Sequence, residues 1–259
     1  MLKTISIESL FDIYSYTLDI KPDEVPLRFI TGPNGYGKTT ILNILNALYT
    51  SKIRELAVIP FKHLQLTFDD GYEVTVAQLR DYTIDEDADE SSLTNVHLDI
   101  EFRKSGNERS LYSIRWDTGG EEDLGNLGLS LYFTSHPLYY IRDGRVQTPD
   151  GVPTVRKHVD ILKELLRENA NSENQSFRER LKVFSDIIEK SAFAHKTMQI
   201  DLRYGYRFIA DNEERTILAV DKLSSGEQQM LIMAFELLFM APDDSLVLID
   251  EPEISFHQM

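Results

Sequence analysis

The segment Gly32–Thr39 reads Gly-Pro-Asn-Gly-Tyr-Gly-Lys-Thr and follows the pattern G-x-x-x-x-G-K-[ST]. Glycines let backbone N–H groups turn inward around an anion without clashes from Cβ atoms. Lys38 adds a cation for the β- and γ-phosphates of a nucleotide, and the Thr39 hydroxyl is a Mg²⁺ ligand type. The pattern predicts a phosphate-binding loop. Its expected contact residues are Gly32, Pro33, Asn34, Gly35, Tyr36, Gly37, Lys38, Thr39 and Thr40.

The segments on either side supply the context that such a loop requires. The apolar run Leu27–Thr31 predicts a strand that leads directly into the glycines. Apolar residues then recur at helical spacing, which predicts a helix with one buried face. These residues are Ile41, Leu42, Leu45, Leu48 and Tyr49. A phosphate loop between a strand and a helix is therefore favoured over a chance glycine turn.

Two carboxylates follow a fully apolar run near the end of the chain. Leu246–Ile249 has the composition of a parallel strand buried on both faces. Asp250 and Glu251 then stand at the carboxyl edge of the sheet, where open α/β sheets bind ligands. This places Asp250 as an outer Mg²⁺ ligand through water and Glu251 as the base for an attacking water. The alternative is an acidic strand end that only terminates the sheet.

A Ser/Gly turn precedes these carboxylates. Ser224, Ser225 and Gly226 open a helix predicted over residues 227–239. Hydroxyl and N–H groups at a helix start can bind an anion. An ordinary N-cap would explain Ser224 or Ser225 equally well, so the order and spacing relative to Asp250 and Glu251 carry the functional interpretation.

Composition narrows the class of protein. The 259 residues carry a net charge of −16, which argues against a uniformly basic nucleic-acid surface but allows a local basic groove. Six acids between Asp81 and Glu90 indicate a solvated loop. No apolar run is long enough to span a bilayer, no signal-peptide pattern is present, and there is no Cys. A cytoplasmic protein is the simplest interpretation.

The remaining pattern predicts an antiparallel region followed by helices. Alternating residues predict a first hairpin around Ile5 to Leu18, a second hairpin over residues 61–76, and strands at 96–103 and 111–116. A Gly-rich link leads to a predicted strand at Leu129–Phe133. Residues 154–190 predict a helical hairpin. Strands near 198–202, 206–210 and 216–220 follow.

In this order, the three motifs resemble those of an ABC-type ATPase head. The glycine loop resembles Walker A, Leu223–Gln229 (LSSGEQQ) resembles the LSGGQ signature, and the carboxylate strand resembles Walker B. The finer resemblance, carried by Ile30–Thr40 and Asp250–His257, is to the SMC/RecF/OLD group. Within that group the chain is most similar to AAA-type ATPases of OLD-family and Septu-type antiphage systems. This resemblance covers essentially the whole chain.

The resemblance implies an architecture and a cofactor set. The fold class is α/β: an ABC-ATPase-like P-loop NTPase with a central mostly parallel sheet, an antiparallel β-subdomain and a short helical insertion. The implied domains are residues 1–153 (Walker A part of the head), 154–190 (helical insertion) and 191–259 (signature and Walker B, truncated). ATP and Mg²⁺ are the implied ligands. A homodimer would enclose ATP between two heads, with Ser224 and Gly226 of one chain contacting nucleotide on the other.

The resemblance also has departures and secondary candidates. Position 225 is Ser where the transporter pattern has Gly, and His136 stands where some heads place a Gln between the lobes. Phe11 and Tyr14 are candidates for the adenine side, with core packing of the first hairpin as the favoured alternative. His257 falls in the stretch that resembles the D-loop.

Several functions stay open. The sequence stops eight residues after Glu251. ABC-type heads continue with a further strand that carries a histidine, the switch His, and with closing helices. We therefore expect that this chain is a fragment or that a partner supplies these elements. The leading hypothesis is an ATPase that dimerises on ATP and signals to a nuclease or other effector, a separate protein or a C-terminal domain, in antiphage defence. A nucleotide-gated scaffold with little turnover is the alternative. A DNA repair or chromosome-maintenance ATPase is another, which leaves nucleic acid open as a partner. A transporter subunit, and with it a membrane partner, is least favoured.

Overall fold

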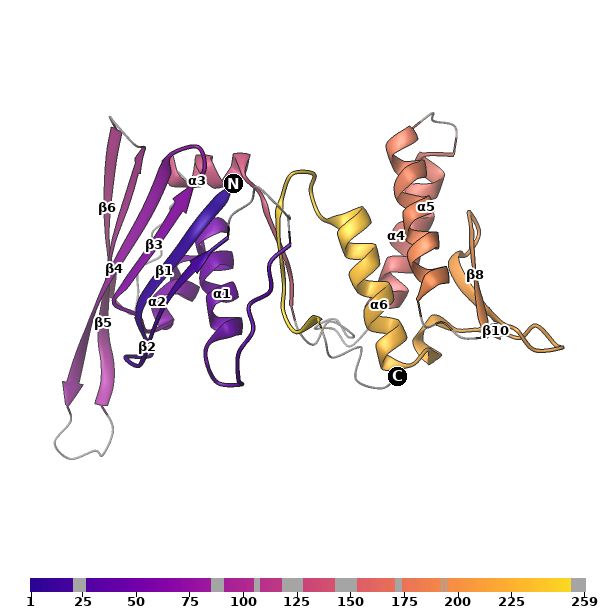
Figure 1. Ribbon diagram of the computed structural model, residues 1–259, viewed down its shortest axis with the longest axis horizontal. Coiled ribbons are helices and arrows are strands. Elements are labelled where there is room, and N and C mark those ends of the chain that lie inside the picture. Colours follow the sequence, from indigo (N-terminus) through magenta and orange to yellow (C-terminus); the bar gives the residue numbers. More distant parts are fainter. Residues whose placement is uncertain are drawn as a thin grey trace. The chain divides into compact units, whose positions relative to one another are not determined.

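The computed structural model describes residues 1–20, 27–84, 91–104, 108–117, 128–142, 153–170, 174–191, 193 and 195–252 (Figure 1). The chain divides into two compact units. The first comprises Met1–Leu138 with Asp244–Leu246, and the second comprises Tyr139–Asp243 with Val247–Met259. None of the described helices combines the length and the apolar character that crossing a bilayer requires.

The first unit is built on a six-stranded, fully antiparallel sheet in the order β2-β1-β3-β4-β5-β6. The strands are β1 (Leu2–Leu10), β2 (Tyr14–Asp19), β3 (His63–Phe68), β4 (Tyr72–Ile84), β5 (Ser91–Lys104) and β6 (Glu108–Asp117). The helices are α1 (Lys38–Tyr49), α2 (Ile53–Val58) and α3 (Gly128–Ser135). The predicted hairpins, and the strands at 96–103 and 111–116, are therefore confirmed.

Alternation along the strands gives this sheet one buried and one solvated face. Ile5, Leu64, Val76 and Leu98 are almost fully buried, whereas their strand neighbours Glu8, Gln65 and Arg103 lie outside the core. The apolar faces of α1 and α2 complete the core; their buried residues are Ile41, Leu42, Ile44, Leu45, Leu48, Ile53 and Leu56. The helix predicted after the glycine loop is confirmed, with the predicted buried face.

The strand predicted at Leu129–Phe133 is wrong, because this segment forms helix α3. Leu129, Tyr132 and Phe133 are spaced i, i+3 and i+4, so a helix puts all three on one buried face, while Leu131 is 71% exposed. The ring of Phe133 packs against Tyr49 of α1 at a centroid distance of 4.2 Å. A short apolar run fits either period, and packing against α1 selects the helical one.

The strand predicted at Leu27–Thr31 is not formed either. In the part of the chain that the structure describes, Leu27 to Thr31 has no regular secondary structure and pairs with no strand. Leu27 is 55% and Phe29 72% exposed. An apolar run becomes a strand only when a neighbouring backbone supplies the ladder of hydrogen bonds, and here none does.

The second unit packs three helices and a small sheet around one core. The helices are α4 (Thr154–Glu168), α5 (Gln175–Lys190) and α6 (Ser225–Phe235), and α6 continues as a π-helical turn η3 (Glu236–Met240). The antiparallel sheet runs β10-β9-β8, with β8 (Lys196–Asp201), β9 (Gly205–Ala210) and β10 (Ile217–Leu218); a short 3₁₀ helix η2 (Val220–Lys222) follows. The predicted helical hairpin, the three strands and the helix after the Ser/Gly turn are confirmed (Figure 1).

The final predicted strand, β11 (Leu246–Ile249), pairs with β7 (Leu138–Ile141). Leu246 N–H donates to Pro137 O at 2.8 Å, and Asp250 N–H donates to Ile141 O at 2.9 Å. From the first of these hydrogen bonds to the second, the residue number rises along both strands, so β7 and β11 are parallel. The α/β class is thus confirmed, but the predicted mostly parallel central sheet appears as this one pair among the described strands, whose other ladders are antiparallel.

A histidine inside the second unit makes its stability depend on pH. His158 of α4 is 4% exposed and its ring stacks on Phe235 at 4.4 Å. Burial lowers the pKa of His158 to about 4 from its ordinary 6.5. Glu236 Oε1 lies 3.7 Å from Nε2, too far for a hydrogen bond, and the neutral ring makes no ion pair with it.

We expect the free energy of unfolding to fall by up to about 3 kcal/mol as pH drops from about 6.5 to about 4. In that window the unfolded chain binds a proton at His158 and the folded chain does not, so acid favours unfolding. Above pH 6.5 this contribution is fully present. Denaturant unfolding measured at several pH values checks the slope.

The matched variant His158→Phe keeps a ring against Phe235 and cannot titrate, so its pH slope should be shallower in this window. His63→Phe changes an exposed histidine of β3 and should keep the wild-type slope. Equal slopes for wild type and His158→Phe would show that another group causes the acid sensitivity.

Candidate functional site

The glycine loop has a backbone shape that only glycines adopt easily. Gly35 and Gly37 have φ angles of 84° and 81°, in the left-handed region. Gly37 is the N-cap of α1 and has no side chain to cap it, so the first N–H groups of the helix face outward from its positive end. Thr31 to Tyr36 are exposed. An open helix start behind a glycine turn suits an anion such as phosphate.

The Lys38 side chain folds back over this loop. Its Nζ donates hydrogen bonds to the carbonyl oxygens of Gly32, at 2.7 Å, and of Pro33, at 3.0 Å. These carbonyls hold the ammonium group over the loop. Phosphate oxygens can replace them as acceptors, because a hydrogen bond between two charged groups is the stronger one. Lys38 is therefore held where it would contact an anion bound in the loop.

The β1–β2 hairpin lies directly beside the loop. The Tyr16 hydroxyl donates to the carbonyl of Tyr36 at 2.8 Å, and the Tyr14 ring lies 5.2 Å from the Tyr36 ring. Phe11, in the hairpin turn, is 39% exposed. The core-packing alternative for Phe11 and Tyr14 is thus wrong, because Phe11 is exposed and Tyr14 is only partly buried. Contact with an adenine remains a proposal.

The end of β11 presents one buried and one exposed carboxylate. Asp250 is 5% exposed, and the Tyr140 hydroxyl donates to its Oδ2 at 3.4 Å. Glu251 is exposed and has a φ of 47°, a left-handed conformation that non-glycine residues rarely adopt. Such strain often accompanies a functional position. The carboxylate of Asp250 and a Thr hydroxyl are oxygen ligands of the type that Mg²⁺ binds.

The Ser/Gly turn forms a capping box at the start of α6. Ser224 Oγ accepts a hydrogen bond from Glu227 N–H at 3.3 Å, and the Glu227 carboxylate accepts from Ser224 N–H at 2.8 Å. The Ser224 hydroxyl also donates to this carboxylate at 2.8 Å. The N-cap interpretation of Ser224 is therefore correct locally. It is compatible with an anion-binding role, since Ser225 and Gly226 begin the helix beyond the cap.

Glu227 links this helix start to β8. Lys196 Nζ donates to Glu227 Oε1, and the Glu227 side chain is 10% exposed. Burial alone would raise the pKa of Glu227, but the hydrogen bonds from Lys196 and Ser224 together lower it. The carboxylate thus stays ionised, and Lys196 neutralises the charge that would otherwise repel an anion here.

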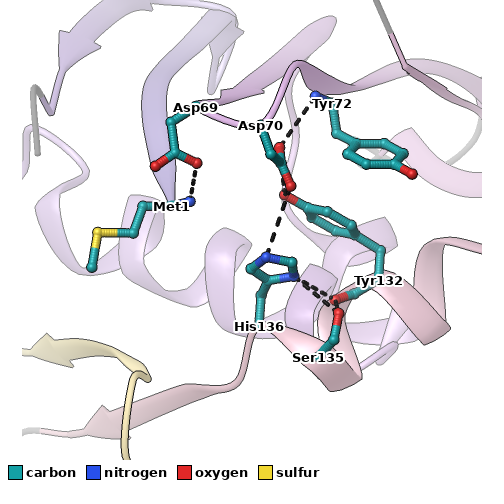
Figure 2. Close-up of polar contacts among 7 residues, drawn as sticks. All are labelled: Met1, Asp69, Asp70, Tyr72, Tyr132, Ser135 and His136. Atoms are coloured by element: carbon teal, nitrogen blue, oxygen red, sulfur yellow. Dashed lines mark hydrogen bonds and ion pairs between the residues drawn. The ribbon is translucent and has the colours of Figure 1, made fainter.

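His136 belongs to a polar cluster at the end of α3 (Figure 2). Its Nδ1 lies 3.0 Å from Tyr132 O, its ring stacks on the Tyr132 ring at 4.4 Å, and its Nε2 is 3.8 Å from Asp70 Oδ2. The Tyr132 hydroxyl donates to Asp70 as well, at 3.0 Å. These contacts join α3 to the β3–β4 turn, which is a structural role. A catalytic role for His136 stays a prediction.

Residues Gly32 to Thr40 run from the glycine loop into the first turn of α1, all within the first unit. Asp250, Glu251, Ser224, Ser225 and Gly226 belong to the second unit. His257 lies outside the described residues. Three contact residues escaped the sequence patterns: Tyr16, Tyr140 and Lys196. No local signal marks them, since each acts on a distant segment, whereas Glu227 could have been found from the capping-box spacing S-x-x-E.

Comparison with known proteins bears on these motifs. A protein-family model described as "AAA domain, putative AbiEii toxin, Type IV TA system" matches residues 27–257. No curated protein matches the sequence. The chain is similar to an Smc head bound to the C-winged helix domain of ScpA, with 13% identity, a TM-score of 0.41, and coverage of 96% of this chain and 88% of that one. It is also similar to an Smc head with an extended coiled coil bound to the C-terminal domain of ScpA, derived from Pyrococcus furiosus. That match has 11% identity, a TM-score of 0.38, and coverage of 96% and 89%.

The chain belongs to this AAA domain family, because the matched region covers nearly its whole length and contains all three motifs. The predicted resemblance to an AAA-type ATPase is thereby confirmed. The TM-scores of the structural matches are low, so the family assignment rests on the sequence match.

Proposed function

We propose that the chain binds MgATP at the Gly32–Thr40 loop and hydrolyses it. The observation that supports this best is Lys38, held by two loop carbonyls over a glycine turn that opens an uncapped helix. Backbone N–H groups bind the phosphates, and Lys38 exchanges its carbonyl acceptors for the β- and γ-phosphate oxygens. Thr39 would hold Mg²⁺ directly and Asp250 would hold it through water, and the metal would neutralise charge on the phosphates. Glu251 accepts the proton of the attacking water.

The direct test is titration of the whole chain with MgATP and MgADP by calorimetry, together with phosphate release measured over time. Saturable binding of both nucleotides and phosphate release would support the proposal. Binding without phosphate release would favour the nucleotide-gated scaffold, and absence of binding would overturn the nucleotide site itself.

We further propose that two chains enclose ATP, with Ser224, Ser225 and Gly226 of one chain facing the nucleotide of the other. The charge-neutralised capping box at the start of α6 supports this, because an anion can approach it without repulsion from Glu227. Opening and closing of this dimer would signal to a nuclease or other effector. The protein would act in antiphage defence in the cytoplasm. The family description, which includes a type IV toxin–antitoxin system, is compatible with such signalling. The segments 1–153, 154–190 and 191–259 remain our proposed functional division of the head.

We expect Gly226→Asp to abolish ATP hydrolysis while the chain stays folded. An acid in the first turn stabilises a helix through the macrodipole, yet its charge repels a phosphate. Mixing inactive Gly226→Asp with inactive Lys38→Ala should restore part of the activity, because a mixed dimer contains one intact site. Phosphate release after mixing is the measurement.

The control variant Gly226→Ala adds a methyl group without charge and should keep most of the activity. If the mixture of the two inactive chains stays inactive although both bind each other, the site does not use groups from two chains.

A further inference from the structure

The loop that would take the phosphates is supported from the side by the β1–β2 hairpin. A Cβ atom built on Gly37 would lie 2.8 Å from Leu10 Cδ2, so the hairpin packs directly against the loop backbone. Leu10 is completely buried, and Phe11 N–H donates to Pro60 O at 2.9 Å. These contacts fix the hairpin, which can therefore act as a wall for the loop.

One hydrogen bond crosses from this wall to a peptide group of the loop. The Tyr16 hydroxyl donates to the carbonyl oxygen of Tyr36 at 2.8 Å. The described peptide bonds are trans, and in a planar trans peptide the C=O and the following N–H point in opposite directions. Holding the Tyr36 carbonyl toward Tyr16 therefore turns the Gly37 N–H away from the hairpin.

The Tyr16 hydroxyl stays protonated, and so stays a hydrogen-bond donor, over the physiological pH range. Partial burial, with smaller contributions from Tyr14 and Tyr36, raises the pKa of Tyr16 above its ordinary value. The hydroxyl thus keeps its proton and continues to donate. Gly37, with its φ of 81°, has the backbone freedom to rotate this peptide if the hydrogen bond is lost.

We propose that Tyr16 is a positioning residue for phosphate binding, whose hydroxyl holds the Tyr36–Gly37 peptide with its N–H toward the phosphates of a nucleoside di- or triphosphate. This inference rests on the proposed function. Tyr16 itself does not touch the nucleotide phosphates; it sets the direction of the Gly37 N–H that does.

The test is Tyr16→Phe in the full chain, which removes one oxygen atom and keeps the ring. We expect the Kd for MgADP and the KM for MgATP to rise about five-fold, the usual worth of one hydrogen bond, with kcat unchanged. Tyr72→Phe removes the hydroxyl of a partly buried tyrosine of β4 that has no part in the proposed site, and it should keep the wild-type Kd. Amide exchange measured by mass spectrometry without nucleotide should increase in the peptide spanning Gly32–Thr40 and stay unchanged in α4.

The readouts separate positioning from a general folding defect, because misfolded chains lower the binding stoichiometry and kcat rather than raise Kd and KM. Wild-type binding with an unchanged Kd in Tyr16→Phe would overturn this inference and leave the proposed function standing. A Tyr72→Phe effect as large as that of Tyr16→Phe would overturn it too. Failure of the wild-type chain to bind MgADP would overturn the proposed function, and this inference with it.

Discussion

Replacing Lys38 by alanine is expected to lower kcat/KM for ATP by about 10²- to 10³-fold, the loss seen when one preorganised charge-stabilising donor is removed. The Lys38 ammonium is the cation of the glycine loop, and its two carbonyl contacts hold it over the site before any phosphate arrives. Without it, charge on the transferred phosphoryl group is stabilised by fewer donors. Phosphate release at subsaturating MgATP measures the loss, and calorimetry measures the accompanying loss of affinity.

Lys52→Ala is the matched control for Lys38→Ala. Lys52 follows α1, is half exposed, and pairs with Glu55 at 3.2 Å within one helical turn. Its removal changes the net charge by the same amount and should leave kcat/KM near the wild-type value. Equal turnover by Lys38→Ala and Lys52→Ala, with both chains folded, would contradict the proposed phosphate site.

Replacing Glu251 by glutamine is expected to lower kcat by about 10²- to 10⁴-fold while the affinity for MgATP is retained. The amide has the size of the carboxyl group but cannot accept the proton of the attacking water. Glu251 sits at the exposed end of β11 with a left-handed backbone, and the neighbouring Asp250 is buried and bonded to Tyr140. Single-turnover phosphate release and nucleotide titration separate the two effects.

The same variant tests the dimer. If hydrolysis opens a pair of ATP-bound heads, Glu251→Gln should accumulate as a dimer with MgATP and as a monomer with MgADP, as measured by light scattering. Glu214→Gln changes an exposed acid of the β9–β10 turn and should behave as wild type. Unchanged turnover in Glu251→Gln would remove Glu251 as the base, whatever the oligomeric state.

Several features could be predicted because each depends on a few adjacent residues. The glycine loop needs left-handed backbone at Gly35 and Gly37, and the glycines themselves state this requirement. The antiparallel hairpins follow from alternation over six or more residues, and the helices α4 and α5 follow from their strong apolar periodicity. The capping box at Ser224 is likewise a spacing of three residues.

Other features could not be predicted, because they depend on which distant segment arrives as a neighbour. Leu129–Phe133 suits a strand or a helix by composition, and contact with Tyr49 decided for the helix. Leu27–Thr31 has strand character but no adjacent backbone to bond. The hydroxyl of Tyr140 meets Asp250 across 110 residues of chain. The periodicity of the sequence does not predict a contact between residues so far apart in the chain.

The sequence by itself thus determined which residues form the candidate site of this AAA protein: the glycine loop with Lys38, the acids at the end of β11, and the Ser/Gly turn at the start of α6. Each is a local arrangement that neighbouring residues specify. Only the tertiary structure decided what holds these groups in place, namely Tyr16 on the loop, Tyr140 on Asp250 and Lys196 on Glu227. Such support comes from hydrogen bonds between remote segments, and these form only once the chain has packed.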